Sequence, residues 1–301
     1  MNEWNFLNWQ GWTAWHFAIA GSGLLLLLIF GVLAYRIRYW IIEGRKLQEV
    51  GYLTPRVTIF ARFARWMLTR FTVWLKVGRL TVIGRQHIQG KARKLIVPNH
   101  QIEHDAGVIP AVLRFLYFRG LMAITQIVGI RRPICAWLGV VPVHHAKDPR
   151  AAVRVSVEVL KAEPDSSMVA FPQGALHRTN VLKVEDFFAG IILIGRMAGP
   201  KDGPNPFVTV PTGVYYDRDP AHASWFQWAV RKLGFKSFRH WFGETTYGVT
   251  VVFGEPIALD ALPKDKKEAM AVVFEKIKEA SDRARTETLK RFGESDTPSA
   301  A

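Results

Sequence analysis

The chain has 301 residues, and because 49% of them are hydrophobic it can bury a substantial core, which argues against a disordered protein. Its single cysteine, Cys135, excludes an intramolecular disulfide and favours a reducing compartment. The formal charge is +15, and +12 of it lies between Arg36 and Lys94, where 14 basic residues stand against 2 acidic ones. This charge directly follows the most hydrophobic stretch, so anionic membrane lipid is the expected partner of the basic segment.

Residues 1–45 are expected to form a membrane anchor with one transmembrane helix. No residue between Glu3 and Arg36 is charged, and Ala18 to Tyr35 is an apolar run of 18 residues, close to the length that spans a bilayer. Basic residues follow the run, which by the positive-inside rule places the remaining chain on the cytoplasmic face. The competing interpretation is a cleaved signal peptide, but a positive n-region and a small-residue cleavage site are missing. Aromatic residues flank the run as an interfacial belt would: Trp12, Trp15, Tyr35, Tyr39 and Trp40.

Residues 46–78 are expected to contain a basic amphipathic helix at the lipid interface. One helical face is polar and free of acidic residues: Arg62, Arg65, Thr69, Thr72 and Lys76. The opposite face is apolar, with Arg70 close to its border: Phe60, Phe63, Met67, Phe71 and Trp74. Because a soluble surface helix normally mixes charges of both signs, we favour the lipid interface over an ordinary helix packed on the domain.

Residues 79–292 are expected to form an α/β domain, followed by a disordered tail at 293–301. Apolar runs predict strands at 80–84, 94–97, 121–125, 139–143, 167–171, 207–216 and 248–253. Helical patterns and caps predict helices at 105–118, 148–163, 186–198 and 264–290. Strands separated by helices indicate a single mixed or mainly parallel sheet flanked by helices.

The segment 97–105 places His100 and Asp105 five positions apart, where a strand ends and a helix begins that Asp105 can cap. A carboxylate bound to Nδ1 orients an imidazole and leaves Nε2 free to take a proton from an alcohol near neutral pH. A His and an Asp at this spacing more often form a turn hydrogen bond than a catalytic dyad. The catalytic interpretation therefore depends on other segments.

Five blocks carry a family resemblance: Asn99-His100-Gln-Ile-Glu-His-Asp105, Gly139-Val-Val-Pro-Val143, Phe171-Pro-Gln-Gly174, Val208-Thr-Val-Pro-Thr-Gly213 and Val252-Phe-Gly-Glu-Pro-Ile257. In this order and spacing they resemble the glycerolipid acyltransferase family, to which 1-acylglycerol-3-phosphate acyltransferases belong. The resemblance implies the fold of that family and an O-acyltransferase with His100 as general base. Asp105 would orient the imidazole while a lipid hydroxyl attacks the thioester of acyl-CoA or acyl carrier protein.

The resemblance also implies where substrates bind. The candidate substrate-binding residues are Asn99, His145, Phe171, Pro172, Gln173, Gly174 and Arg178, and backbone amides around Gly174 are candidate oxyanion donors. No cofactor besides the thioester co-substrate is expected. No metal is expected either, because the remaining histidines lack a defensible ligand spacing: His104, His144, His145 and His177.

The third block departs from the usual Phe-Pro-Glu-Gly-Thr-Arg, in which the Glu and Arg are associated with the acceptor's glycerol phosphate. Here Gln173 and Leu176 take those places, and His145 stands where the second block usually ends in Arg. Lys147, Arg150 or Arg178 could partly replace them, without the same fork geometry. The acceptor is therefore either lysophosphatidic acid-like or a less anionic lysophospholipid, glycolipid or other lipid alcohol.

Two further classes of function stay open. The same dyad could act on water or on a phospholipid, as a hydrolase or a transacylase. Alternatively, the basic segment could be a non-enzymatic binding surface. Nucleic acid is not expected as its partner, because the charge adjoins a membrane span and its aromatic residues do not interleave with the arginines.

Overall fold

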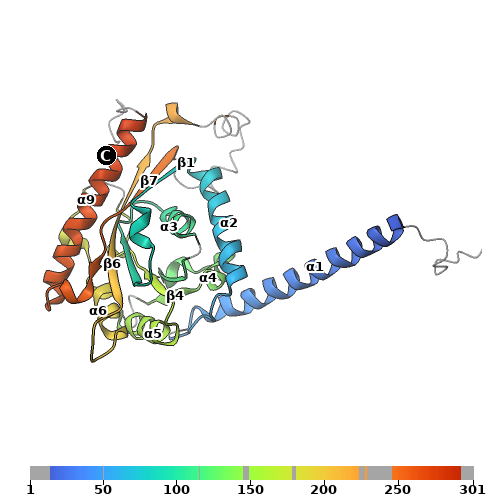
Figure 1. Cartoon of the computed structure of the whole chain (residues 1–301), viewed down its shortest axis with the longest axis horizontal. Helices are drawn as coiled ribbons and strands as arrows, with labels where there is room; N and C mark the ends of the chain where they lie inside the picture. Colours follow the sequence, from blue (N-terminus) through green and yellow to red (C-terminus); the bar gives the residue numbers. More distant parts are fainter. Residues whose placement is uncertain are drawn as a thin grey trace, which may run out of the picture.

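An eight-stranded sheet lies at the centre of the computed structural model, which describes residues 14–49, 51–114, 116–144, 149–177, 181–223, 228 and 246–292. The strand order is β1-β7-β6-β2-β5-β3-β4, with β8 paired to β6. All pairs are parallel except those of β6 with β7 and with β8. This confirms the predicted mixed, mainly parallel sheet flanked by helices (Figure 1). The strands are β1 (Arg79–Ile83), β2 (Arg93–Pro98), β3 (Phe118–Ala123), β4 (Val140–Val143), β5 (Ser167–Val169), β6 (Phe207–Asp217), β7 (Gly248–Phe253) and β8 (Ile257–Ala258).

Two hydrophobic cores fill the two sides of the sheet, because successive side chains of a strand point to opposite faces. Leu95 and Val97 of β2 pack in one core with apolar residues of α5, α6 and α9. Ile96, between them, packs in the other core with residues of α2 and α3. The helices are α1 (Ala14–Lys46), α2 (Ile59–Lys76), α3 (Asp105–Leu113), α4 (Arg131–Trp137), α5 (Pro149–Ala162), α6 (Gly190–Ala198) and α9 (Lys266–Phe292).

Several predicted boundaries were wrong, and the causes are local. Helix α3 ends at Leu113 rather than near 118, because Arg114 has a φ of 52° and the chain turns into β3. The helix expected from 186 begins at Gly190, after a 3₁₀ turn at Val184–Asp186. Helix α4 and strand β8 were not predicted, since each is short. The expected disordered tail lies outside the described residues.

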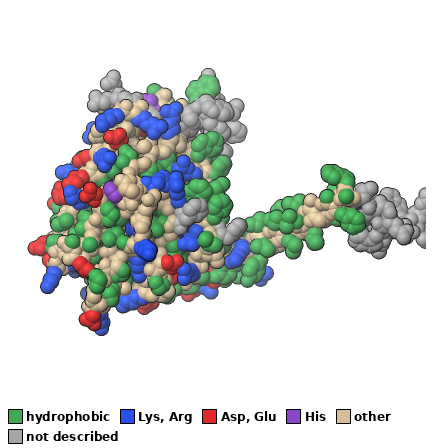
Figure 2. Space-filling model, viewed as in Figure 1, with side chains coloured by type: hydrophobic (Ala, Val, Ile, Leu, Met, Phe, Trp, Pro, Cys, Tyr) green, Lys and Arg blue, Asp and Glu red, His purple; other side chains and the backbone are tan. Residues whose placement is uncertain are grey.

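Helix α1 extends away from the domain as a single rod (Figure 1). It has 33 residues, and among the described residues it is the helix that is long and apolar enough to cross a membrane. Its surface is covered with hydrophobic side chains (Figure 2). Its last turns pack on α4, where a Cβ on Gly44 would lie 2.5 Å from the carbonyl carbon of Arg132. Trp12 of the expected aromatic belt lies outside the described residues.

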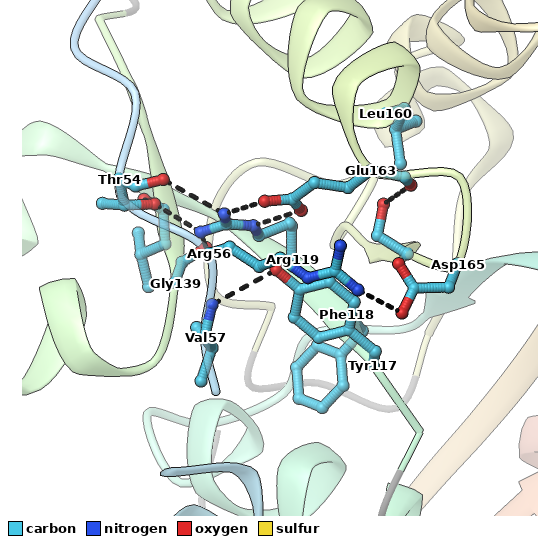
Figure 3. Close-up of polar contacts among 12 residues, drawn as sticks. Thr54, Arg56, Val57, Tyr117, Phe118, Arg119, Gly139, Leu160, Glu163 and Asp165 are labelled. Carbon is cyan, nitrogen blue, oxygen red and sulfur yellow. Dashed lines mark hydrogen bonds and ion pairs between the residues drawn. The ribbon is translucent and has the colours of Figure 1, made fainter. Parts of the chain in front are cut away.

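Hydrogen bonds tie the segment between α1 and α2 to a buried ion pair of the domain, Arg119 with Glu163 (Figure 3). Arg119 of β3 donates from Nε to Glu163 Oε2 at 2.9 Å and from Nη1 to the Thr54 hydroxyl at 2.6 Å. The amide of Val57 donates to the hydroxyl of Tyr117 at 3.3 Å, and burial raises the pKa of Tyr117 to about 12. The connection between α1 and α2 is thus held against the domain by hydrogen bonds.

Helix α2 packs its basic face on the domain and leaves its apolar face exposed, so the lipid interface expected for this helix stays a prediction. Arg65 is 1% exposed; its guanidinium lies 4.0 Å from the Phe118 ring centroid and donates to the carbonyl of Leu116 at 3.3 Å. Burial lowers the pKa of Arg65 to about 10. Arg70 is exposed, and the side chain of Phe60 lies outside the description. The exposed row is the apolar one, including Phe63, Met67, Phe71 and Trp74, and hydrophobic side chains gather along this side of the domain (Figure 2).

Candidate active site

The loop between β2 and α3 brings His100 and Asp105 together. His100 Nδ1 lies 2.8 Å from Asp105 Oδ2, so the ring nitrogen not engaged by the carboxylate is Nε2. Asp105 is fully buried, whereas the His100 side chain is 20% exposed. A buried carboxylate on Nδ1 and a partly accessible ring are what a general base requires, because they orient the imidazole and leave its reactive face open to a ligand.

Asp105 is the acceptor of a dense set of hydrogen bonds. Its Oδ2 also accepts from the amides of Gln101 at 2.7 Å and Ile102 at 3.1 Å. The expectation that Asp105 caps α3 was wrong, because these amides precede the helix; the N-cap position is His104, without a side-chain cap bond. These donors hold the carboxylate in one orientation beside the imidazole.

Tyr216 is a site residue that the sequence analysis missed. Tyr216 lies on β6, and its hydroxyl donates to Asp105 Oδ1 at 2.5 Å. The two residues are 111 positions apart in the sequence. No spacing rule links two residues so far apart. The available signal was the alternation of β6, which places Tyr216 with Val214 and Val210 on the face that packs against α3.

The turn after β5 places a second set of predicted residues beside His100. The Phe171 ring stacks on the imidazole with centroids 4.2 Å apart, and Gln173 Oε1 accepts from the His100 amide at 2.6 Å. Gly174 closes the turn by donating to the Phe171 carbonyl at 3.1 Å, with a φ of 64° that favours glycine. Pro172 is buried, and its carbonyl accepts from the Phe188 amide at 2.9 Å.

Asn99 lies in a different environment from that of a substrate-binding residue. It is fully buried; its Oδ1 accepts from the Val214 amide at 2.7 Å and its Nδ2 donates to the Val214 carbonyl at 3.1 Å. These bonds hold the end of β2 against β6, which is a positioning role. His145 and Arg178, the other predicted substrate-binding residues, lie outside the described residues, as does Lys147.

An open pocket of about 300 Å³ lies at the turn after β5, lined by Gln173, Gly174, Ala175, His177, Glu185, Asp186 and Phe188. One lining residue contacts the backbone of His100, since the His177 amide donates to the His100 carbonyl at 2.8 Å. His177 Nδ1 also lies 3.6 Å from Asp186 Oδ2. The described lining thus offers two carboxylates and no Lys or Arg.

Within the described ranges, no three His, Cys, Asp or Glu side chains come close enough to hold a metal ion. The expectation of a metal-free reaction stays a prediction.

The family model described as Acyltransferase matches residues 79–212, a range that includes His100, Asp105 and the turn at 171–174. No curated protein matches the chain. Among solved structures, the crystal structure of the 1-acyl-sn-glycerophosphate (LPA) acyltransferase PlsC from Thermotoga maritima is similar, with a TM-score of 0.52 and 17% identity over 89% of this chain and 97% of that chain. The predicted family resemblance and fold are confirmed.

Proposed function

We propose that the protein is a membrane-bound O-acyltransferase, because the family model described as Acyltransferase matches residues 79–212. It transfers a fatty acyl group from the thioester of acyl-CoA or acyl carrier protein to the hydroxyl of a lipid acceptor. The observation that carries this proposal is the 2.8 Å contact between His100 Nδ1 and the buried carboxylate of Asp105.

The proposed mechanism is a direct transfer. His100 Nε2 removes the proton of the acceptor hydroxyl as its oxygen bonds to the thioester carbonyl carbon. The C–S bond then breaks, and the imidazolium returns the proton to the leaving thiolate. Gly174 uses its amide within the turn, so the amides that follow it, at Ala175 and Leu176, are the proposed donors to the oxyanion.

A radiolabelled acyl thioester tests this function directly. Membranes containing the protein are expected to transfer the label into a lipid of a total lipid extract, whereas membranes containing the His100→Ala variant are not. Release of labelled fatty acid without an acylated lipid would instead indicate a hydrolase. Acyl transfer between phospholipids without a thioester would indicate a transacylase.

We also propose that α1 spans the bilayer, with the catalytic domain on the cytoplasmic face and α2 along the membrane surface. In Figure 1 α2 stands at a steep angle to α1, at the side from which α1 leaves the domain. A bilayer crossed by α1 would thus meet the exposed apolar row of α2. Insertion of this row would hold the domain against the leaflet that contains the lipid acceptor.

Replacing Phe71 with Asp tests the role of α2. Phe71 is exposed, so the folded state should lose less than about 0.5 kcal/mol. Loss of a lipid-inserted phenyl ring should nevertheless lower turnover of acceptor in vesicles by about tenfold. Val272→Asp, the same kind of change at an exposed site on α9, is the matched control. Equal turnover by both variants would contradict the proposed docking of α2.

The pocket favours an acceptor without a phosphate monoester. Glu185 and Asp186 would repel such a dianion, and Gln173 and Leu176 provide no guanidinium to bind it. Besides a lysophosphatidic acid-like acceptor, we therefore propose a neutral or zwitterionic lysolipid as the alternative acceptor that the pocket favours.

Replacing both acids, Glu185→Gln with Asp186→Asn, should raise kcat/KM for lysophosphatidic acid relative to a neutral lysolipid by roughly fivefold, since each removed charge weakens a partly screened repulsion. The double variant Glu275→Gln with Asp282→Asn makes the same change in net charge on exposed sites of α9. If both double variants change the ratio equally, the effect is one of overall charge, and the pocket does not select the headgroup.

A further inference from the structure

The hydroxyl of Tyr216 completes a buried chain of contacts that ends at the proposed base. It lies 2.5 Å from Asp105 Oδ1, and Tyr216 and Asp105 are 3% and 0% exposed. The two residues come from different elements, β6 and the first turn of α3. A contact between buried groups of this kind excludes water as an alternative partner, so the carboxylate depends on the tyrosine.

Tyr216 donates in this contact and does not accept. Burial, and then the negative charge of Asp105, raise the pKa of Tyr216 well above its ordinary value. The hydroxyl therefore keeps its proton at any pH at which the enzyme works. An ionised carboxylate can only accept, so the direction of the hydrogen bond is determined.

The two oxygens of Asp105 have separate partners. Oδ2 accepts from the imidazole and from the amides of Gln101 and Ile102, whereas Oδ1 accepts from Tyr216. A carboxylate that accepts a hydrogen bond from a hydroxyl attracts an imidazolium less strongly than a carboxylate without that donor. The hydrogen bond from Tyr216 on β6 therefore partly determines the strength of the Asp105–His100 interaction.

We propose that Tyr216 is a positioning residue that holds the Asp105 carboxylate and, through it, limits the basicity of His100. This inference rests on the proposed function, in which His100 takes a proton from the acceptor and returns it to the thiolate. An imidazolium that is bound too tightly by its carboxylate would keep that proton. Tyr216 thus assists the transfer of the proton from His100 to the thiolate as much as the transfer from the acceptor hydroxyl to His100.

The Tyr216→Phe variant keeps the ring and removes only the donor. Without it, Asp105 stabilises the imidazolium more strongly, so the acid limb of the pH profile of kcat/KM should move upward by about one pH unit. We expect kcat to fall by about tenfold, with KM for the thioester unchanged. Tyr215→Phe is the matched control, because the neighbouring residue packs on the opposite face of the sheet with Ala280 and Ala284.

The Tyr216→Phe variant leaves the other ionisable groups near the dyad unchanged, so they do not account for the expected shift of the pH profile. The His177 ring pairs with Asp186, and the charge of Arg218 acts on the Tyr216 hydroxyl. Glu185 lines the pocket at the turn after β5.

A titration that needs no turnover separates this inference from the proposed function. In the full-length protein with ¹³C-labelled histidine, the His100 signal is assigned by its loss in His100→Ala. Its pKa should be higher in Tyr216→Phe than in wild type and unchanged in Tyr215→Phe. If wild type transfers acyl groups but Tyr216→Phe titrates like wild type, the role of Tyr216 is refuted and the proposed function stands.

The dependence on Asp105 provides the second test. In an Asp105→Asn background the Tyr216→Phe change should shift the His100 pKa no further, because the carboxylate that couples them is gone. A shift of equal size with and without the carboxylate would overturn the inference.

Discussion

Replacing His100 with alanine is expected to lower kcat for acyl transfer by about 10³-fold, which makes it the largest effect on activity. General acid–base catalysis by a positioned histidine contributes roughly 10²–10⁴-fold, and here one ring is proposed to move the proton in both directions. The variant loses the ring that contacts Asp105 and Phe171 but keeps the backbone bonds of residue 100 to Gln173 and His177. The expected loss is therefore chemical, and initial rates with a labelled acyl thioester measure it.

His222→Ala is the matched control for this loss. His222 Nδ1 lies 2.8 Å from Asp217 Oδ2, the same distance and the same sequence separation of five as in the proposed dyad. This pair lies beyond the residues that match the family model. We expect His222→Ala to transfer acyl groups at a rate near that of wild type. If His100→Ala stays active, or if both variants fail equally while folded, the proposed role of His100 is refuted.

Replacing Glu163 with glutamine is expected to have the largest effect on stability, about 3–5 kcal/mol. Arg119 and Glu163 are 1% and 7% exposed, so neutralising the acid leaves a buried guanidinium without its counter-charge. Arg119 also donates to the hydroxyl and to the carbonyl of Thr54, but these groups cannot replace the carboxylate, because neither carries a charge. Urea denaturation of the full-length protein in detergent measures the change.

The control for this prediction is Asp165→Asn, only two positions away. Asp165 pairs with Arg56 at 2.7 Å, but the side chains are 50% and 59% exposed (Figure 3). An exposed pair contributes at most about 1 kcal/mol. Equal destabilisation by the two variants would show that burial does not determine the strength of these contacts, contrary to the expectation.

The sequence predicted those features that depend on neighbours along the chain. The strands at 94–97 and 248–253 are mainly apolar runs that favour burial, and both form within a residue or two of the expected ends. His100 and Asp105 were paired correctly because the turn between them is short. The helix at α5 was predicted from the proline at its first position, and it begins there.

Contacts between distant segments could not be predicted in the same way. Tyr216 reaches Asp105 because β6 happens to lie beside β2, and Arg119 meets Glu163 across 44 positions. The helical periodicity of α2 separated its two faces, but it could not tell which would be buried. The backbone carbonyls of Leu116 and Leu138 and the ring of Phe118, which together accommodate Arg65, become visible only once the strands are assembled.

The continuity of α1 into the domain has a consequence for how substrates are presented. A helix of 33 residues is about 50 Å long, against roughly 30 Å of hydrocarbon, so its basic end would stand beyond the bilayer as a rigid post. Gly44 packs this end of α1 directly against the backbone of α4, where there is no room for a side chain. The height and orientation of the catalytic domain above the leaflet would then depend on the length of this helix, and one inserted residue would turn the domain by about 100° about the axis of α1.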